Sequence, residues 1–130
     1  LTMADAQTLL AEPERIWWNL RLSKNGGLVN TLKLAKLAGG RGVTFVLGCM
    51  VGETGILSAI QRRFLQLGAG PRFLEGNYGK HLLRDDITKP SPRFSYGGKI
   101  KPFAAPGLGV EVREDKLAEY AKHLFTLGVH

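Results

Sequence analysis

The chain has 130 residues, enough for one domain with a hydrophobic core, and its 44% hydrophobic and 22% charged residues are typical of soluble globular proteins. No apolar run is long enough to cross a bilayer, and the residues after Leu1 lack the basic and apolar pattern of a signal peptide. The single cysteine, Cys49, excludes an intramolecular disulfide and favours a cytoplasmic location.

Lysine and arginine outnumber aspartate and glutamate by 18 to 11, which gives a formal net charge of +7. A basic nucleic-acid-binding module is therefore one function to consider. The basic residues are scattered, however, with Arg62-Arg63 as the longest adjacent pair, and no RNA-binding, zinc-finger or basic-zipper motif occurs. The charge suits an anionic substrate equally well, so nucleic acid is the less favoured partner.

Helices and strands alternate in the first part of the chain. Residues 5–14 predict a short helix, and the aromatic and apolar residues 16–22 predict a strand. The break at residues 25–27 is followed by a second helix over 28–37, where apolar residues recur with helical spacing. The glycines at 39–40 end that helix.

The alternation continues as far as residue 75. Residues 43–47 are apolar on both faces, as in a buried parallel strand, and Thr54 is placed to cap a helix over 55–67. A weaker strand is expected over residues 72–75. The order β-α-β-α-β predicts an α/β fold with a parallel sheet and helical crossovers, in a (β/α) barrel or a doubly wound sheet.

The pattern changes from residue 85 onward. Prolines and glycines indicate a loop-rich stretch, followed by a short strand over 108–112 and a terminal helix over 114–127. We therefore expect two parts, a partial (β/α) barrel over residues 1–89 and a loop-rich tail over residues 90–130.

Active-site groups in both candidate folds follow the carboxyl ends of the strands. Lys24 comes just after the first strand, where a barrel would direct it into the mouth. Burial among apolar walls would favour its neutral amine, which can act as a base. The competing interpretation is a solvated lysine. Arg21 is predicted to lie on the opposite face and to form a structural salt bridge.

The turn after the second strand supplies the next candidates. The backbone amides of Gly48, Cys49 and Met50 can approach a substrate closely, because glycine permits such an approach. Glu53 either lines the substrate pocket and braces Lys24, or is a first-turn acid favoured by the helix dipole. No histidine is near Cys49 in sequence, so a small buried residue is favoured over a nucleophile.

Four segments together resemble a known family. Residues 19–27, Asn-Leu-Arg-Leu-Ser-Lys-Asn-Gly-Gly, are similar to the sixth-strand motif of the muconate lactonizing subgroup of the enolase superfamily. Residues 48–56 and 82–88 resemble the loop after strand seven and the segment after strand eight. Residues 106–110 resemble the closing motif, where the chain returns to the capping domain. The resemblance implies about strands six to eight of a TIM-type barrel, from the mandelate racemase/muconate lactonizing family.

The resemblance also implies a chemistry. Enzymes of this kind remove the α-proton of a small carboxylate, with Mg²⁺ stabilising the enediolate, and act as cycloisomerases, racemases or epimerases, or related lyases. Lys24 would be an acid/base catalyst. Glu75 would contact the substrate or act as a proton donor, with Gly76 a competing match for that position and Tyr78 within reach of the pocket. The family's second lysine and three metal ligands have no counterpart here, so Asp5 is a helix-cap candidate and we expect no metal site in this chain alone.

A non-catalytic half-barrel is the alternative function. Three β/α units cannot close a barrel, and uncovered strand edges favour pairing with another chain. The partner would be a missing N-terminal half of the barrel or a second copy of the chain, with no membrane involved. The start at Leu1 favours a fragment, and we expect the isolated chain to be inactive.

Overall fold

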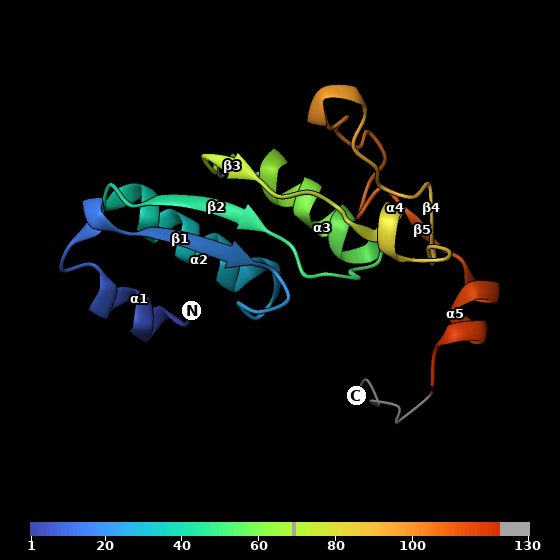
Figure 1. The fold of residues 1–130 in the computed structure, drawn as a ribbon, viewed down its shortest axis with the longest axis horizontal. Helices are drawn as coiled ribbons and strands as arrows, with labels where there is room; N and C mark the ends of the chain where they lie inside the picture. The colour runs from blue at the N-terminus through green and yellow to red at the C-terminus, as the bar shows by residue number, and fades with distance from the viewer. Residues whose placement is uncertain (69, 123–130) are drawn as a thin grey trace.

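The protein is described by a computed structural model, in which residues 1–68 and 70–122 are placed. Its centre is a parallel sheet of three strands, β1 (Trp17–Arg21), β2 (Thr44–Gly48) and β3 (Phe73–Leu74), in that order across the sheet (Figure 1). The predicted α/β class and parallel sheet are confirmed. The third strand is shorter than expected, with only two paired residues.

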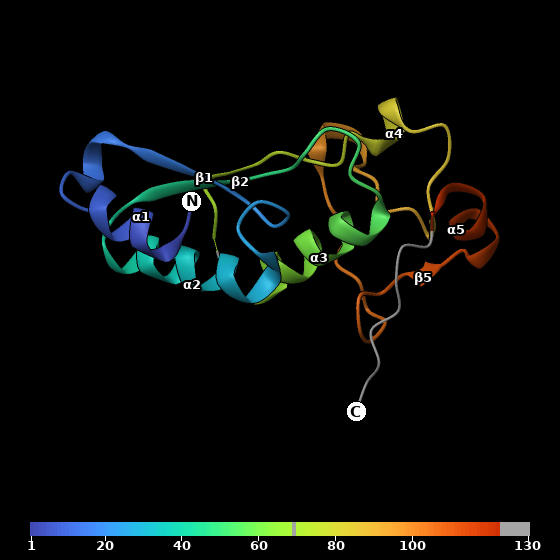
Figure 2. The ribbon, with the colours of Figure 1, turned by 90° about the horizontal axis from the view of Figure 1, so that it is seen from below.

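Two helices connect these strands and cover one face of the sheet. The helix α2 (Gly27–Gly40) joins β1 to β2, and α3 (Gly55–Gln66) joins β2 to β3. Figure 2 shows both helices, together with α1 (Met3–Leu9), on the same side of β1 and β2. The predicted helices over 28–37 and 55–67 are therefore confirmed, with α2 longer by one turn.

The first helix ends earlier than predicted. Its start is a capping box, in which Thr2 Oγ1 accepts from the backbone N–H of Asp5 and the Asp5 carboxylate accepts from that of Thr2. The predicted capping role of Asp5 is thus confirmed. The helix ends at Leu9, and a separate 3₁₀ turn, Pro13–Arg15, follows, because proline cannot continue an α-helix from its interior.

The hydrophobic core lies between the sheet and the two crossover helices. Alternate residues of the strands point toward the helices and are buried, among them Trp18, Leu20 and Leu47. They meet Leu34 from α2 and the fully buried Phe64 from α3. Each side chain of this size stabilises the fold by about 1.5–3 kcal/mol through its burial.

The other face of the sheet carries no helix of the described residues (Figure 2). Trp17 and Phe73 lie there and stack across β2, with ring centroids 5.9 Å apart, yet they are 56% and 57% exposed. Trp17 therefore lies outside the core, because strand parity places it opposite to Trp18. In a closed (β/α) barrel this face would be the interior, which three strands do not enclose.

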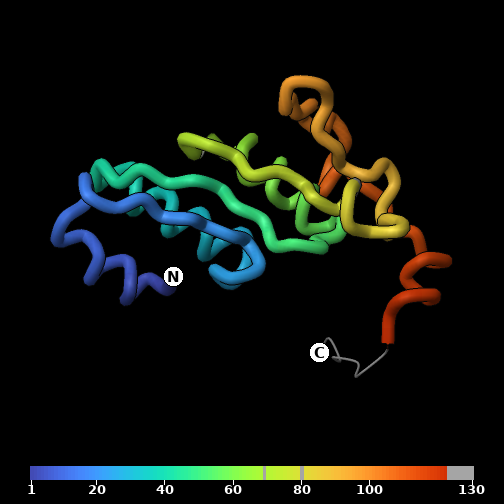
Figure 3. The backbone as a smooth tube through the Cα atoms, viewed as in Figure 1, coloured from blue at the N-terminus to red at the C-terminus, as the bar shows by residue number. Residues whose placement is uncertain are grey.

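The residues after β3, numbers 75–122, extend away from the parallel sheet (Figure 3) and are called the tail from here on, in place of the predicted tail over residues 90–130. The tail contains a single helical turn, α4 (Gly79–Leu82), and an antiparallel pair, β4 (Thr88–Lys89) with β5 (Glu111–Val112). The expected strand over 108–112 is thus reduced to its last two residues. The pair joins residues on both sides of the predicted boundary at residue 89, and that boundary stays a prediction.

The last helix, α5, spans Glu114–Tyr120 and begins where the sequence predicted. Ala121 is already extended, so the helix ends before the predicted limit, and residues 123–127 of that prediction lie outside the described residues. A 3₁₀ turn, Tyr96–Gly98, lies in the loop before β5. No helix among the described residues has the length and apolar character required to span a membrane.

Two arginines of α3 hold the tail against the sheet unit. Arg62 is buried and donates to the carbonyls of Arg93 and Lys101, at 2.7 and 3.1 Å, while its guanidinium lies 4.7 Å from the centre of the Phe103 ring. Arg63 donates to the carbonyl of Phe103 at 3.2 Å. The longest adjacent basic pair of the sequence therefore has internal partners, which weakens the argument for nucleic-acid binding.

Candidate functional site

The carboxyl ends of the three parallel strands meet at one edge of the sheet, where active-site groups of such folds lie. The turn after β1, the loop after β2 and the segment after β3 are joined there by side chains. The Gln61 amide, buried in α3, donates to the carbonyls of Gly48 and Glu75, at 3.3 and 3.1 Å. The Glu75 N–H continues the ladder by donating to the Leu47 carbonyl at 2.9 Å.

Three polar side chains converge above Gly48. In the register of the sheet Arg21 lies opposite Gly48, and Asn19 precedes Arg21 on the same face of β1. A methyl group on Gly48 would lie 2.3 Å from Asn19 Oδ1, 2.9 Å from Glu75 Oε2 and 3.0 Å from Arg21 Nε. Only glycine leaves room for these groups to approach one another. Gly48 is therefore part of the strand-end edge, as predicted, and its role in substrate binding stays a prediction.

Arg21 lies within this group rather than in a structural ion pair. Its Nη1 donates to the sulfur of Met50 at 3.6 Å, and its Nε is buried without a hydrogen-bond partner among the described residues. No salt bridge to Arg21 occurs in the described part of the chain. The predicted salt bridge is therefore wrong. The residue that pairs with Arg21 on β2 is Gly48, which has no acidic side chain.

Lys24 lies beyond this group. β1 ends at Arg21, and the chain turns at once, with the N–H groups of Lys24 and Asn25 both donating to the Arg21 carbonyl at 2.9 and 2.8 Å. The Lys24 side chain is exposed at the tip of this turn. The structure of this chain thus differs from the expectation of a lysine buried by apolar walls, and the catalytic role of Lys24 stays a prediction.

Glu53 braces two of the loops at this edge. Its Oε1 accepts from Ser23 Oγ at 3.0 Å and from the Met50 N–H at 2.8 Å. Glu53 therefore links the turn that carries Lys24 to the loop after β2, which agrees with the bracing interpretation. It precedes the first residue of α3 by two positions, so it is not a first-turn acid.

The N-terminus of α3 is capped by a distant residue. Thr54 occupies the N-cap position, but its side chain makes no capping hydrogen bond, contrary to the sequence-based expectation. Instead, Asp86 Oδ1 accepts from the Gly55 N–H at 2.9 Å, and Asp86 Oδ2 accepts from Ser91 Oγ at 2.6 Å. Asp86 therefore joins the segment before β4 to the start of α3.

Cys49 is a buried residue of the loop, as its small size and lack of a nearby histidine predicted. Its thiol donates to the Gly76 carbonyl at 2.9 Å. Burial raises the pKa of this thiol, and the carboxylates of Glu53 and Glu75 raise the pKa further. Cys49 is therefore held as a neutral thiol that ties the second loop to the third segment.

Glu75 and Tyr78 are both exposed beside this edge. Glu75 faces the space above Gly48, whereas Tyr78 lines a neighbouring hollow of about 420 Å³ with His81 and Phe94. The structure thus brings together Gly48, Cys49, Met50, Glu53 and Glu75 from the predicted set. Sequence reasoning missed Gln61, although a glutamine on the buried side of a helix is a usable signal.

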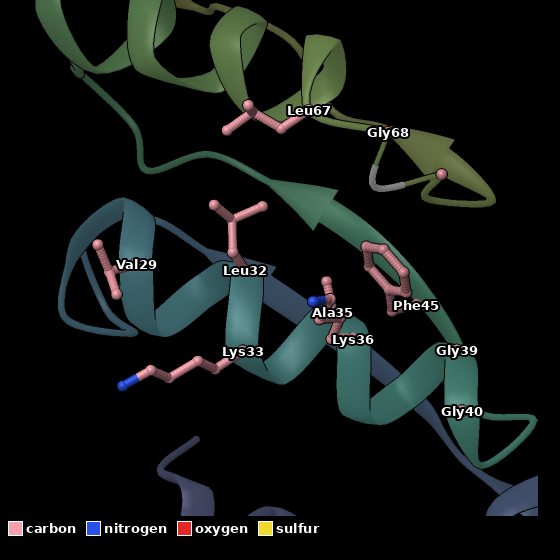
Figure 4. A pocket seen from close by; sticks show the side chains of 11 residues that line it. Val29, Leu32, Lys33, Ala35, Lys36, Gly39, Gly40, Phe45, Leu67 and Gly68 are labelled. Carbon is pink, nitrogen blue, oxygen red and sulfur yellow. The ribbon is translucent and has the colours of Figure 1, made fainter.

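A second hollow, of about 640 Å³, lies on the helical side of the sheet between α2 and the end of α3 (Figure 4). Its walls are mainly apolar and include Val29, Leu32, Phe45 and Leu67, with Lys33 and Lys36 among the α2 residues that line it. The described residues that line it include no carboxylate, histidine or cysteine, so it offers fewer reactive groups than the polar edge above Gly48.

The described residues contain no group of three or more histidine, cysteine, aspartate or glutamate side chains that could hold a metal ion. Two of the carboxylates near the strand ends are engaged elsewhere, Glu53 with Ser23 and Met50, and Asp86 with Gly55 and Ser91, which leaves Glu75 as the carboxylate that faces Gly48. The described residues therefore do not fit a Mg²⁺ ion.

Several solved structures resemble this fold. Muconate lactonizing enzyme from Pseudomonas putida matches with a TM-score of 0.79 at 24% identity over 93% of this chain, and N-succinyl Arg/Lys racemase from Bacillus cereus with 0.71 at 24% over 91%. An isomerase from Streptomyces coelicolor matches with 0.76 at 27% over 92%. The chain spans about a third of these structures, with 33%, 31% and 31% of their lengths covered.

A family model described as enolase C-terminal domain-like matches residues 1–116, which include the whole sheet unit and most of the tail. The parallel sheet, the crossover helices and the structural likenesses agree with this match. The chain therefore belongs to the enolase C-terminal domain-like family, in the mandelate racemase/muconate lactonizing branch of the enolase superfamily.

Proposed function

We propose that this chain supplies strands six to eight of a TIM-type barrel enzyme that removes the α-proton of a small carboxylate substrate. The complete enzyme would be a cycloisomerase, a racemase or epimerase, or a related lyase. In this proposal the chain returns to a capping domain at residues 106–110, and the enzyme acts in the cytoplasm.

The observation that carries the proposal is the polar group above Gly48. It lies at the carboxyl ends of parallel strands, on the face that a closed barrel would turn inward. One cation, Arg21, and one carboxylate, Glu75, face the same small space there. A site that holds both a cation and a carboxylate suits a reaction in which negative charge develops on a bound carboxylate substrate.

Each candidate residue has a defined part in this proposal. Lys24 exchanges a proton with the substrate α-carbon after the remaining barrel has covered its turn, and Glu53 holds that turn through Ser23. The amides of Gly48, Cys49 and Met50 and the carboxylate of Glu75 contact the substrate. Mg²⁺, if the complete enzyme uses it, supplies Lewis-acid stabilisation from ligands outside this chain, because the residues here do not fit it.

Proton exchange in D₂O by the complete barrel protein tests this function. Incubation with a panel of carboxylates and Mg²⁺, followed by mass spectrometry, should reveal deuterium at the α-carbon of at least one compound. Lys24→Ala should abolish that exchange, and retained exchange would remove Lys24 from the mechanism. A gene without an upstream Lys-x-Lys motif and three spaced acids would contradict the enzyme function itself.

A self-associating half-barrel is the second candidate, and the exposed inner face favours it. Trp17 and Phe73 present stacked rings to solvent on that face. Covering them would bury apolar area that water now contacts. Sedimentation of the isolated chain distinguishes the two: a dimer that Trp17→Ser dissociates supports self-association, and a strict monomer argues against it.

A further inference from the structure

We propose that Arg21 is the residue of this chain that binds the anionic group of the substrate, an assignment that rests on the proposed function. A guanidinium stays protonated at every working pH, so it cannot act as a base. It can hold a carboxylate through two parallel hydrogen bonds, and it can stabilise negative charge that develops on that group. Its role is therefore different from the acid/base role predicted for Lys24.

The position of Arg21 is the first support. Its side chain leaves the last residue of β1 toward the inner face of the sheet, and its Nε would lie 3.0 Å from a methyl group built on Gly48. The absent side chain at Gly48 lets Arg21, Asn19 and Glu75 lie close together on the inner face of the sheet, which no helix of the described residues covers. Glu75 is exposed there, so water and salt screen its charge.

The unused hydrogen-bond donors of Arg21 are the second support. Its Nε is buried without a partner among the described residues, and Nη1 reaches only a thioether sulfur, which is a weak acceptor. Buried donors without acceptors are costly, and a carboxylate would satisfy them. Arg62 shows the contrast, because both of its Nη atoms donate to backbone carbonyls of the tail.

The backbone around Arg21 is fixed before any ligand binds. The Arg21 N–H donates to Oδ1 of the buried Asn25 at 2.7 Å, and Asn25 Nδ2 donates to the Leu1 carbonyl at 2.8 Å. Gln61 holds the neighbouring strand ends through Gly48 and Glu75. A cation on such a fixed frame loses little conformational entropy on binding.

Binding of malonate to the complete barrel protein, followed by calorimetry, tests this assignment without knowledge of the substrate. Measurements on Mg²⁺-supplemented and EDTA-treated protein separate the arginine from any metal. Arg21→Met should weaken malonate binding by about 10- to 100-fold in both forms, because a charge-assisted bidentate contact is lost. Arg41→Met is the matched control, since Arg41 is exposed at the opposite end of the sheet, after α2. It should leave malonate affinity unchanged.

Two further variants separate binding from structure. Arg21→Lys should recover part of the malonate affinity, because lysine restores the positive charge but cannot form two parallel hydrogen bonds from one plane. Arg21→Ala should regain binding when guanidinium is added at a concentration below denaturation, and sodium chloride at equal ionic strength should not restore it. Equal malonate affinity in wild type and Arg21→Met, equal losses in Arg21→Met and Arg41→Met, or absence of guanidinium rescue would each overturn the assignment.

The outcomes also separate this inference from the proposed function. Malonate binding that depends on Arg21, in a protein that exchanges no α-proton, would support the anion site and contradict the enzyme. Proton exchange that survives Arg21→Met at full rate would support the enzyme and contradict the anion site.

Discussion

The sheet unit and the tail are stabilised by different interactions. In the sheet unit apolar side chains from strands and helices fill one buried layer, with Leu20, Leu47 and Phe64 fully enclosed. The tail has only two short paired strands, and side chains of the sheet unit hold its backbone, with Arg62 as the main buried contact. An extended apolar layer thus stabilises the sheet unit, whereas the tail combines a few buried residues, such as Pro92, with hydrogen bonds from Arg62 to its backbone carbonyls.

This difference explains where the candidate site lies. A site at strand ends needs a rigid frame, and the core beneath β1 and β2 provides it. The tail contributes from outside, through Asp86 at the start of α3 and through Gly76, against which the Phe94 ring packs. Variants that affect one region and not the other will show how far the two are independent.

Removal of the Phe64 side chain should have the largest effect. Phe64 is 0% exposed between α3 and the sheet, so Phe64→Ala should lower the free energy of unfolding by about 3–5 kcal/mol, through lost burial and a remaining cavity. Urea denaturation measures this change. Phe73→Ala is the matched control, because Phe73 is 57% exposed and should cost far less. Equal losses would show that the core does not lie where we place it.

A methyl group at Gly55 should disturb the contact between the two regions. In Gly55→Ala the new carbon would lie 1.8 Å from Thr88 Oγ1 and 2.9 Å from Pro92 Cδ, and overpacking of this kind costs about 1–3 kcal/mol. Thermal unfolding is the measurement. Gly39→Ala adds the same methyl inside α2, where nothing lies within 4 Å, and should leave stability unchanged or raise it. A neutral Gly55→Ala would contradict the close packing of tail and α3.

The order of strands and helices could be predicted from local patterns, because the apolar residues of β1, α2, β2 and α3 follow the periods that burial on one or two faces imposes. The inner face could not be predicted as well. Parity alone placed Lys24 and Arg21 on opposite faces, but the strand ends at Arg21, so Lys24 belongs to a turn. Strand parity therefore applies to Arg21 and not to Lys24, whose catalytic role stays a prediction.

Long-range contacts explain why the cap of α3 and the role of Gln61 were not predicted correctly from the sequence. Thr54 has the residue type and position of a helix cap, yet Asp86, 31 residues later, makes the hydrogen bond. Gln61 joins two strands from a helix, and no local pattern indicates which carbonyls it reaches. These contacts depend on the packing of the tail, where proline and glycine give turns but little information about direction.

Arg62→Met should loosen the tail and leave the sheet unit intact. The variant keeps the apolar stem but removes donors from the carbonyls of Arg93 and Lys101, each of which then lacks a partner. We expect a loss of about 1–3 kcal/mol. Hydrogen exchange should increase over residues 93–105 and stay unchanged in β1 and β2. Arg15→Met, at an exposed surface pair, controls for the charge. Faster exchange throughout the sheet would show that the regions unfold together.

The smallest expected effect concerns Asp85, which joins the start of the tail to α5 through Arg113 and Lys116. A hydrogen bond from the Asp86 N–H lowers the pKa of Asp85 below its ordinary value of 3.8, and Lys116 and Arg113 lower the pKa further. Because the folded-state pKa is the lower one, this carboxylate stabilises the fold above about pH 4 and ceases to do so as the pH falls through the folded value. Asp85→Asn should therefore be slightly less stable than wild type at pH 7.

The stability difference between wild type and Asp85→Asn should shrink as the pH falls below 3.8, and urea denaturation between neutral and acid pH measures it. Glu14→Gln removes one negative charge from an exposed residue and corrects for the change in net charge. A difference that stays constant down to acid pH would assign the effect of Asp85→Asn to packing instead of charge. In that case α5 would be held by the shape of its contacts, and the tail would resemble the sheet unit more closely than its exposed ion pairs indicate.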